Sequence, residues 1–227
     1  MLTKHFAFVE LSCVLKFYPK SKRPIEDRSN LVTDIDRAVA RKFDVEYYDG
    51  DRLTGYGGYG YSPRFWTDTV AHIVDVYSLS NDSKILDIGC AKGYMMYDLS
   101  LLIPEAEIKG VDISQYAKDH AIEPMKENIV VSNANNLPFP DDYFDLVIAI
   151  NTLHNLPLID CKQAFREINR VTRNNSFVMN DAWRDAKGKQ SMLSWNLTAL
   201  TYMSCDDWED LFKEVDYKGD YYWFFAE

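Results

Sequence analysis

The sequence has few cysteines, and none is placed to hold a metal ion or a disulfide framework. No CxxC pair occurs, and no histidine stands at a ligand-like spacing from the four scattered residues Cys13, Cys90, Cys161 and Cys205. Zinc sites and secreted disulfide scaffolds need closely spaced ligands or paired cysteines. The sequence therefore predicts no metal site and a reducing, cytoplasmic location.

Long hydrophobic runs are also missing, whereas a membrane-spanning helix takes about 20 apolar residues. The apolar stretch over residues 6–15 is interrupted by Glu10 and lacks a small-residue cleavage pattern. We therefore expect neither a signal peptide nor membrane insertion.

Basic residues are in deficit: 25 Lys and Arg stand against 35 Asp and Glu, which gives a net charge of −10. A protein that coats a nucleic-acid duplex needs a large cationic face, so no nucleic-acid partner is expected. Lys20, Lys22 and Arg23 could form a local basic patch, although a charge run of that size is usually a solvated loop.

The dinucleotide fingerprint GxGxxG is absent, although a glycine turn is present. Residues 85–88 form an aliphatic run typical of a buried parallel strand, residues 89–93 read GCAKG, and residues 94–99 resemble a helix. Ala91 and Tyr94 stand where the fingerprint requires glycine. Such a turn lets the backbone approach a ligand and directs N–H groups toward it, but it also occurs as plain structure in α/β proteins.

A second acidic residue ends the next predicted strand, residues 107–112. Asp112 lies 25 positions after Asp87, a spacing that suits a carboxylate binding both hydroxyls of a ribose laid across the first strand. Ile113 would then lie against an adenine ring. Periodicity further predicts helices over residues 31–43, 65–77, 116–125 and 192–203, and a final strand over residues 221–225.

The most specific motif lies between Asn133 and Ile150. LPFPDDYFDLVIAI, residues 137–150, places apolar, proline, acidic and strand elements in one order. Together with DIGCAKG, residues 87–93, it resembles the class I S-adenosylmethionine-dependent methyltransferases of the small-molecule type, with a methyltransferase 11-like domain. The family has an acidic residue where this chain has Asn133, and an amide can still accept from the adenine amino group and donate to a ring nitrogen.

The resemblance implies an α/β fold over residues 62–227: a Rossmann-like three-layer sandwich with a mostly parallel seven-stranded sheet and an antiparallel last strand. Residues 1–61 are expected to form an N-terminal extension and lid packed on this core. The cofactor would be S-adenosyl-L-methionine, which becomes S-adenosyl-L-homocysteine. The positions expected to bind it are Asp87, Gly89, Cys90, Ala91, Gly93, Asp112, Ile113, Asn133, Ala134, Asn135 and Asn151.

Residues 47–66 are dense in tyrosine and glycine, which favours a mobile lid with stacking and hydroxyl groups, while low-complexity flexibility is the alternative. Arg64 could position an acceptor or hold the methionine carboxylate of the cofactor. The candidate substrate-binding residues are Tyr56, Tyr59, Tyr61, Arg64, Trp183 and Arg184.

Methyl transfer from a sulfonium requires alignment of the acceptor and the removal of one proton. His154 is the histidine in the loop after the strand that ends at Ile150, and Asp181 is the second candidate base. A lone histidine is, however, more often structural. Asn151 stands where metal-dependent catechol-type methyltransferases carry an acidic ligand, which argues against a metal, and no DPPY or NPPY tetrad follows that strand.

The sequence thus predicts a methyltransferase that acts on a small polar acceptor, foremost an oxygen of a sugar, sugar nucleotide or surface-glycan precursor in polysaccharide biosynthesis. Two alternatives stay open: an N-methyltransferase of an amine-bearing small molecule or macromolecule, and a non-catalytic S-adenosylmethionine-binding module. The oligomeric state is not readable from the sequence.

Overall fold

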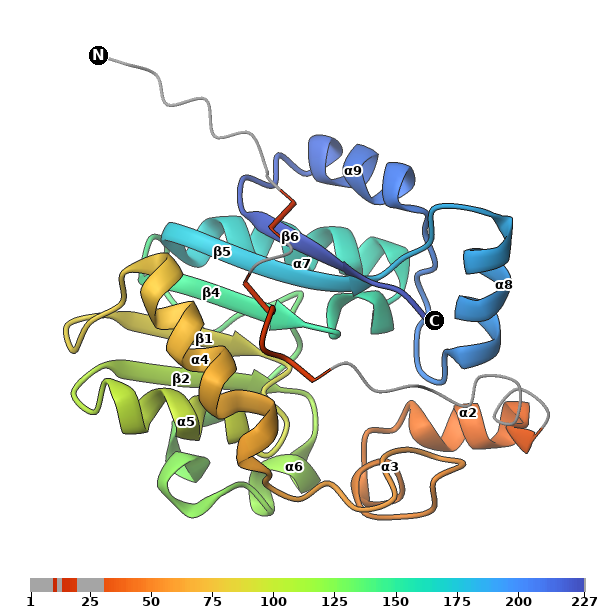
Figure 1. Cartoon of the computed structure of the whole chain (residues 1–227), viewed down its shortest axis with the longest axis horizontal. Coiled ribbons are helices and arrows are strands. Elements are labelled where there is room, and N and C mark those ends of the chain that lie inside the picture. The colour runs from red at the N-terminus through yellow and green to blue at the C-terminus, as the bar shows by residue number, and fades with distance from the viewer. Residues whose placement is uncertain (1–9, 12–13, 20–30, 227) are drawn as a thin grey trace.

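The computed structural model describes residues 10–11, 14–19 and 31–226, and this part of the chain folds around a parallel sheet (Figure 1). The strands are β1(Lys84–Ile88), β2(Glu107–Asp112), β3(Ile129–Val131), β4(Phe144–Ile150), β5(Thr172–Asp181) and β6(Asp220–Phe224). They lie in the order β3-β2-β1-β4-β5-β6, and all neighbours pair in parallel. The chain runs outward from β1 to β3 and returns beside β1 with β4. The carboxyl ends of β1 and β4 therefore flank a topological switch point, where open α/β sheets bind ligands.

Helices cover both faces of the sheet, so the three-layer, Rossmann-like prediction is confirmed (Figure 1). Ile85 packs among residues of α4 and α5, whereas its neighbour Leu86 packs among residues of α7 and α9 on the opposite face. This alternation follows from the two-residue side-chain period of a strand. The helices are α2(Asp34–Ala40), α3(Val45–Tyr48), α4(Pro63–Tyr77), α5(Tyr94–Leu102), α6(Gln115–Asp119), α7(Leu158–Val171), α8(Ala186–Trp195) and α9(Cys205–Glu214), with 3-10 turns η1(Glu123–Asn128) and η2(Leu153–Asn155).

The predicted antiparallel last strand is wrong, and the described residues hold six strands rather than the expected seven. Phe177 lies opposite Asp220 and Asp181 lies opposite Phe224, so β6 runs parallel to β5. The chain leaves the carboxyl end of β5, passes through α8 and α9, and returns to the other end of the sheet before β6 begins. A crossover of this kind makes a parallel neighbour.

Two of the predicted helices are shorter than expected. Thr33 caps α2 with a reciprocal Thr33–Asp36 hydrogen-bond pair. Phe43, at φ 50°, has a left-handed backbone that separates α2 from α3. The helix expected over residues 116–125 divides into α6 and η1. The helix predicted over residues 65–77 is confirmed as part of α4, which has Pro63 at its first turn.

The helix predicted over residues 192–203 is wrong in position. Asp185 caps α8 by accepting a hydrogen bond from the backbone N–H of Gly188, and the helix ends at Trp195. Beyond it the side chain of Asn196 accepts from Ala199 N and donates to Asp181 Oδ2. An amide side chain that bonds the backbone in this way competes with a helix.

Some sequence predictions fall on positions that the structure does not cover. Lys20, Lys22, Arg23 and Cys13 lie outside the described residues. Cys90, Cys161 and Cys205 are buried free thiols. Within residues 31–226 and the two short N-terminal pieces, no helix is long and apolar enough to cross a membrane, and no group of three or more His, Cys, Asp or Glu side chains could hold a metal ion.

Candidate functional site

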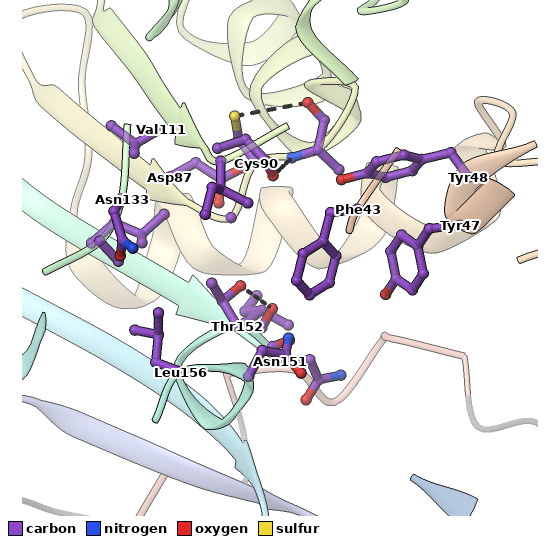
Figure 2. Close-up of a pocket in the computed structure, with 18 of the residues that line it drawn as sticks. Phe43, Tyr47, Tyr48, Asp87, Cys90, Val111, Asn133, Asn151, Thr152 and Leu156 are labelled. Carbon is purple, nitrogen blue, oxygen red and sulfur yellow. Dashed lines mark hydrogen bonds between the residues drawn. The ribbon is translucent and has the colours of Figure 1, made fainter. Parts of the chain in front are cut away.

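A cavity of about 350 Å³ lies at the carboxyl ends of β1, β2 and β4. This volume is in the range of small-molecule pockets. The strand ends and the loops after them line one side, and residues 41–59 of the N-terminal segment line the other. Figure 2 shows Phe43 and Tyr47 across the cavity from Val111 and Asn133. The cavity therefore lies between the carboxyl edge of the sheet and the N-terminal segment. We call residues 41–61 of this segment the lid.

The glycine turn brings the end of β1 against the end of β4. Gly89 has φ 77°, and a Cβ atom there would lie 2.0 Å from Thr152 Oγ1. Ala91 and Asn151 also have positive φ, 50° and 53°, and both line the cavity. Left-handed backbone at residues other than glycine is strained and gathers at functional sites. This part of the cavity wall is thus made of left-handed backbone, packed at Gly89 closely against the side chain of Thr152.

Asp112 presents both carboxylate oxygens at the tip of β2. Ala91 N donates to Oδ2 and Ser114 N donates to Oδ1, each at 2.8 Å. Each oxygen accepts one of these bonds and retains a lone pair, and the residue lines the cavity. Burial raises the pKa of Asp112, and the backbone N–H groups partly oppose the rise. The carboxylate is held so that two adjacent hydroxyls of a ligand can bind it.

Asp87, in β1, is 4% exposed and also lines the cavity. Burial, together with the negative charge of Asp112, raises the pKa of Asp87 to about 8. The carboxyl group is therefore mostly protonated at neutral pH in the ligand-free protein. A cationic ligand in the cavity would favour its ionised form.

We expect Asp87→Asn to remove part of the pH dependence of folding. Between about pH 4 and the folded-state pKa of about 8, the folded protein keeps a proton that the unfolded chain has released, so stability falls as pH rises. Urea denaturation at pH 5 to 9 should show that the free energy of unfolding depends less on pH for Asp87→Asn than for the wild type. Relative to the wild type, the variant should become more stable as the pH rises toward 8. The exposed Asp82→Asn is the matched control, and parallel profiles for Asp87→Asn and the wild type would refute the assignment.

Asp49 fastens the lid to the glycine turn. Lys92 Nζ donates to Asp49 Oδ2 at 2.6 Å, Tyr116 Oη donates to the same oxygen at 2.8 Å, and Tyr59 N donates to Oδ1 at 3.0 Å. Partial burial opposes the charged form, but these hydrogen bonds lower the pKa of Asp49 to about 2. Since Lys92 lies inside the turn, next to the cavity-lining residues Cys90 and Ala91, these bonds tie the lid to the cavity wall.

Tyrosines form most of the inner face of the lid. The rings of Tyr56 and Tyr59 are 4.5 Å apart between centroids, and Tyr59 stacks on Tyr94 of α5 at 5.2 Å. Burial raises the pKa of Tyr47, Tyr48 and Tyr59, so their hydroxyls remain protonated and can donate hydrogen bonds. The lid thus offers aromatic faces and neutral hydroxyls.

Of the six predicted substrate-binding residues, Tyr56 and Tyr59 line the cavity and the other four do not. Tyr61 Oη donates to Asp98, and the exposed guanidinium of Arg64 lies over the ring of Phe65. Trp183 packs with Met192 and Ala226, and Arg184 forms an ion pair with Glu10 at 3.0 Å.

Nine of the eleven predicted cofactor residues line the cavity: Asp87, Gly89, Cys90, Ala91, Asp112, Ile113, Asn133, Ala134 and Asn151. Gly93 instead faces Met125, where a Cβ atom would lie at 3.1 Å. Asn135 Nδ2 donates to Asp160 Oδ1 at 2.8 Å. Gly93 and Asn135 therefore make contacts within the protein, beside the turn and in the neighbouring loop, rather than at the cavity.

His154 and Asp181 are close together, but neither lines the cavity. Asp181 N donates to His154 Nδ1 at 3.2 Å, so the ring proton resides on Nε2, which lies 3.6 Å from Asp181 Oδ2. The carbonyl oxygen of His154 accepts from Leu200 N and Thr201 N. Burial lowers the pKa of His154, although the charge of Asp181 opposes this. The pair ties η2 to the end of β5 and to the chain after α8.

We expect His154→Ala to act on stability more than on ligand binding. Loss of a buried hydrogen-bonded ring costs about 1–3 kcal/mol. Because the folded state keeps this ring neutral, the wild type loses stability as pH falls below the unfolded-state pKa of about 6.5, and the variant lacks that loss. Urea denaturation at pH 5.5 and 7.5 measures both effects, with the exposed His120→Ala as control. A variant with wild-type stability but without turnover would restore His154 as the base.

Several lining residues were not predicted from the sequence. Tyr47 and Tyr48 belong to the tyrosine-rich segment, which was a usable signal, and Asn155 follows His154 in the loop after β4. For Arg41 and Lys42, at the end of α2, no motif pointed to the cavity.

Residues 86–179 match the family model described as a methyltransferase domain. The chain is 30% identical over 132 residues to malonyl-[acyl-carrier protein] O-methyltransferase of Legionella pneumophila, covering 56% of this chain and 45% of that protein. It is 29% identical to demethylmenaquinone methyltransferase of Lysinibacillus sphaericus, covering 57% of this chain and 55% of that protein. The chain therefore spans about half the length of these curated relatives.

The fold is also found among solved structures. The YcgJ protein of Bacillus subtilis superimposes with a TM-score of 0.53 at 20% identity, covering 64% of this chain and 66% of that one. A putative sarcosine dimethylglycine methyltransferase of Galdieria sulphuraria gives 0.53 at 18% identity, covering 66% and 60%. At such identities the likeness extends to the fold alone.

Proposed function

We propose that this chain, which contains a class I S-adenosylmethionine-dependent methyltransferase domain, transfers a methyl group from S-adenosylmethionine to an oxygen of a small polar acceptor. The observation that carries the proposal is the cavity at the topological switch point. Asp112 lines this cavity, and backbone N–H groups orient its carboxylate. Open α/β sheets bind nucleotide-like ligands at this place.

The residues present suit the cofactor. Asp112 would bind the ribose hydroxyls, Asn133 would bind the adenine edge, and the turn at Gly89 allows close approach of the backbone. The neutral carboxyl of Asp87 would ionise beside a cation. When bound, S-adenosylmethionine would supply a sulfonium methyl group: the acceptor oxygen would form a bond to the methyl carbon as the carbon–sulfur bond breaks, the hydroxyl proton would pass to solvent, and S-adenosylhomocysteine would be released.

The other side chains act by positioning. The protonated hydroxyls of Tyr47 and Tyr48 can donate to acceptor oxygens, and the lid excludes water from the cavity when Asp49 is bound to Lys92. We assign His154 and Asp181 to holding the loop after β4 rather than to proton transfer, since neither lines the cavity and the backbone N–H of Asp181 donates to His154 Nδ1.

We further propose that the acceptor is a sugar, a sugar nucleotide or a related surface-glycan precursor. Support comes from Phe43, Tyr47 and Tyr56, which line the cavity with aromatic rings of the kind that stack on the C–H face of a pyranose, and from the two tyrosine hydroxyls. The placement of residues 1–61 as extension and lid, with residues 62–227 as the catalytic domain, belongs to the same proposal.

The test combines cofactor binding with an acceptor panel. Calorimetry with S-adenosylhomocysteine should show saturable binding, and methyl-labelled S-adenosylmethionine should label members of a panel of sugars and sugar nucleotides. Labelling confined to amine acceptors would favour N-methylation instead. Tight cofactor binding with no labelling of the sugar or amine panels would favour a non-catalytic binding module, and absence of binding would overturn the proposal.

A further inference from the structure

Arg41 fixes one end of the lid to the chain that follows α8. Its Nε donates to Thr198 O and its Nη2 donates to Ala199 O, both at 3.3 Å. The next two residues, Leu200 and Thr201, donate their N–H groups to His154 O, beside the end of β4. Arg41 is thus held over the β4 and β5 side, whereas Asp49 holds the lid on the β1 and β2 side.

The guanidinium of Arg41, a residue that lines the cavity, retains unused hydrogen-bonding capacity. A guanidinium has five N–H donors, and the two bonds made are long. Among the described residues, neither Arg41 nor Lys42, which also lines the cavity, forms an ion pair. Two cations therefore border the cavity without a carboxylate partner in that part of the chain.

Asn155 adds an unfilled acceptor to the same cavity. Its Nδ2 donates to Asn151 O at 3.3 Å, but its Oδ1 is buried without a hydrogen-bond partner. A buried amide oxygen needs a donor, and a hydroxyl group on a ligand supplies one. Three carboxylates also line the cavity: Asp87 and Asp112 lie in β1 and β2, and Asp160 already accepts from Asn135.

We propose that Arg41, with Lys42, recognises an anionic group on the methyl acceptor, so that the acceptor is a hydroxylated small molecule bearing a phosphate or a carboxylate. The planar guanidinium suits either anion through paired hydrogen bonds. Asn155 Oδ1 accepts from a hydroxyl of the same molecule. This inference rests on the proposed function and narrows its substrate class, because neutral sugars lack the group that Arg41 binds.

The test uses small anions, so it does not depend on identifying the acceptor. Protein saturated with S-adenosylhomocysteine is titrated calorimetrically with inorganic phosphate and, separately, with malonate, at ionic strength balanced with chloride. Saturable binding of at least one anion is expected, and Arg41→Gln should weaken it about tenfold. The stronger of the two ligands distinguishes a phosphate-bearing from a carboxylate-bearing acceptor.

Arg37→Gln, on α2 but away from the cavity, is the matched control and should bind the anion as the wild type does. Arg41→Lys keeps the charge and should retain part of the affinity, which separates recognition from misfolding. Absence of saturable binding, equal binding by Arg41→Gln, or loss of S-adenosylhomocysteine binding in Arg41→Gln would overturn the inference. If the wild type fails to bind S-adenosylhomocysteine, the proposed function fails, and the same titrations on the free protein still test Arg41.

Discussion

Asp112→Ala is expected to weaken the binding of S-adenosylhomocysteine by at least about 100-fold. Hydrogen bonds to a charged group contribute about 1.5–3 kcal/mol each, and about 2.7 kcal/mol corresponds to 100-fold. Both oxygens of Asp112 are already oriented by the backbone N–H groups of Ala91 and Ser114, so the ligand would meet a fixed carboxylate. Isothermal calorimetry measures the change directly.

The same two backbone bonds require a control, because their loss can disturb the glycine turn. Asp112→Asn keeps one side-chain acceptor and the shape of the residue, so its affinity should fall between the wild type and Asp112→Ala. Thermal unfolding of the free proteins shows whether the fold is intact. Equal binding by Asp112→Ala and the wild type would show that the ribose assignment is wrong.

The sequence predicts well the side of the cavity that the glycine turn and the ends of β1 and β2 form, because this side depends on local sequence pattern. A strand, a glycine turn and a helix fix the path of the backbone from β1 to α5, and an acid at the end of β2 reaches the same edge by strand geometry alone. The chain could hardly place Asp112 elsewhere once β1 and β2 pair in parallel. Short-range rules therefore suffice for this part.

Other features depend on contacts between distant segments, which a single sequence does not reveal. The direction of β6 follows from the crossover through α8 and α9, and the family pattern suggested the opposite. The loop position of His154 was predictable, but its orientation depends on Asp181 N, 27 residues away. Arg41 reaches the cavity because residues 198 and 199 accept its N–H groups, and no motif signals that pairing.

The lid is bound directly to the glycine turn, which gives the site its main physical constraint. Lys92 belongs to the glycine turn and is also the ammonium that binds Asp49 of the lid. The positions of the turn and of the lid are thus linked through one partly buried ion pair. A substitution that displaces the turn is therefore expected to affect both the stability of the protein and the position of the lid. Gly89 is the position where such a displacement is most direct.

Gly89→Ala is expected to destabilise the protein by about 2–5 kcal/mol, because a left-handed alanine costs about 1–2 kcal/mol and overpacking adds about 1–3 kcal/mol. The new Cβ atom would lie 2.0 Å from Thr152 Oγ1, 2.6 Å from its Cγ2 and 2.8 Å from its Cβ. Urea denaturation measures the loss. Gly60→Ala is the matched control in the lid, because a Cβ atom there meets nothing within 4 Å.

The two causes can be separated with the Thr152→Gly background, which removes all three close atoms. Adding Gly89→Ala in that background should cost only the backbone part, about 1–2 kcal/mol, since φ remains positive. The difference from its cost in the wild-type background is the coupling between the ends of β1 and β4, expected at about 1–3 kcal/mol. Additive costs would mean that the two strand ends are not in contact, and the cavity wall derived from them would then be wrong.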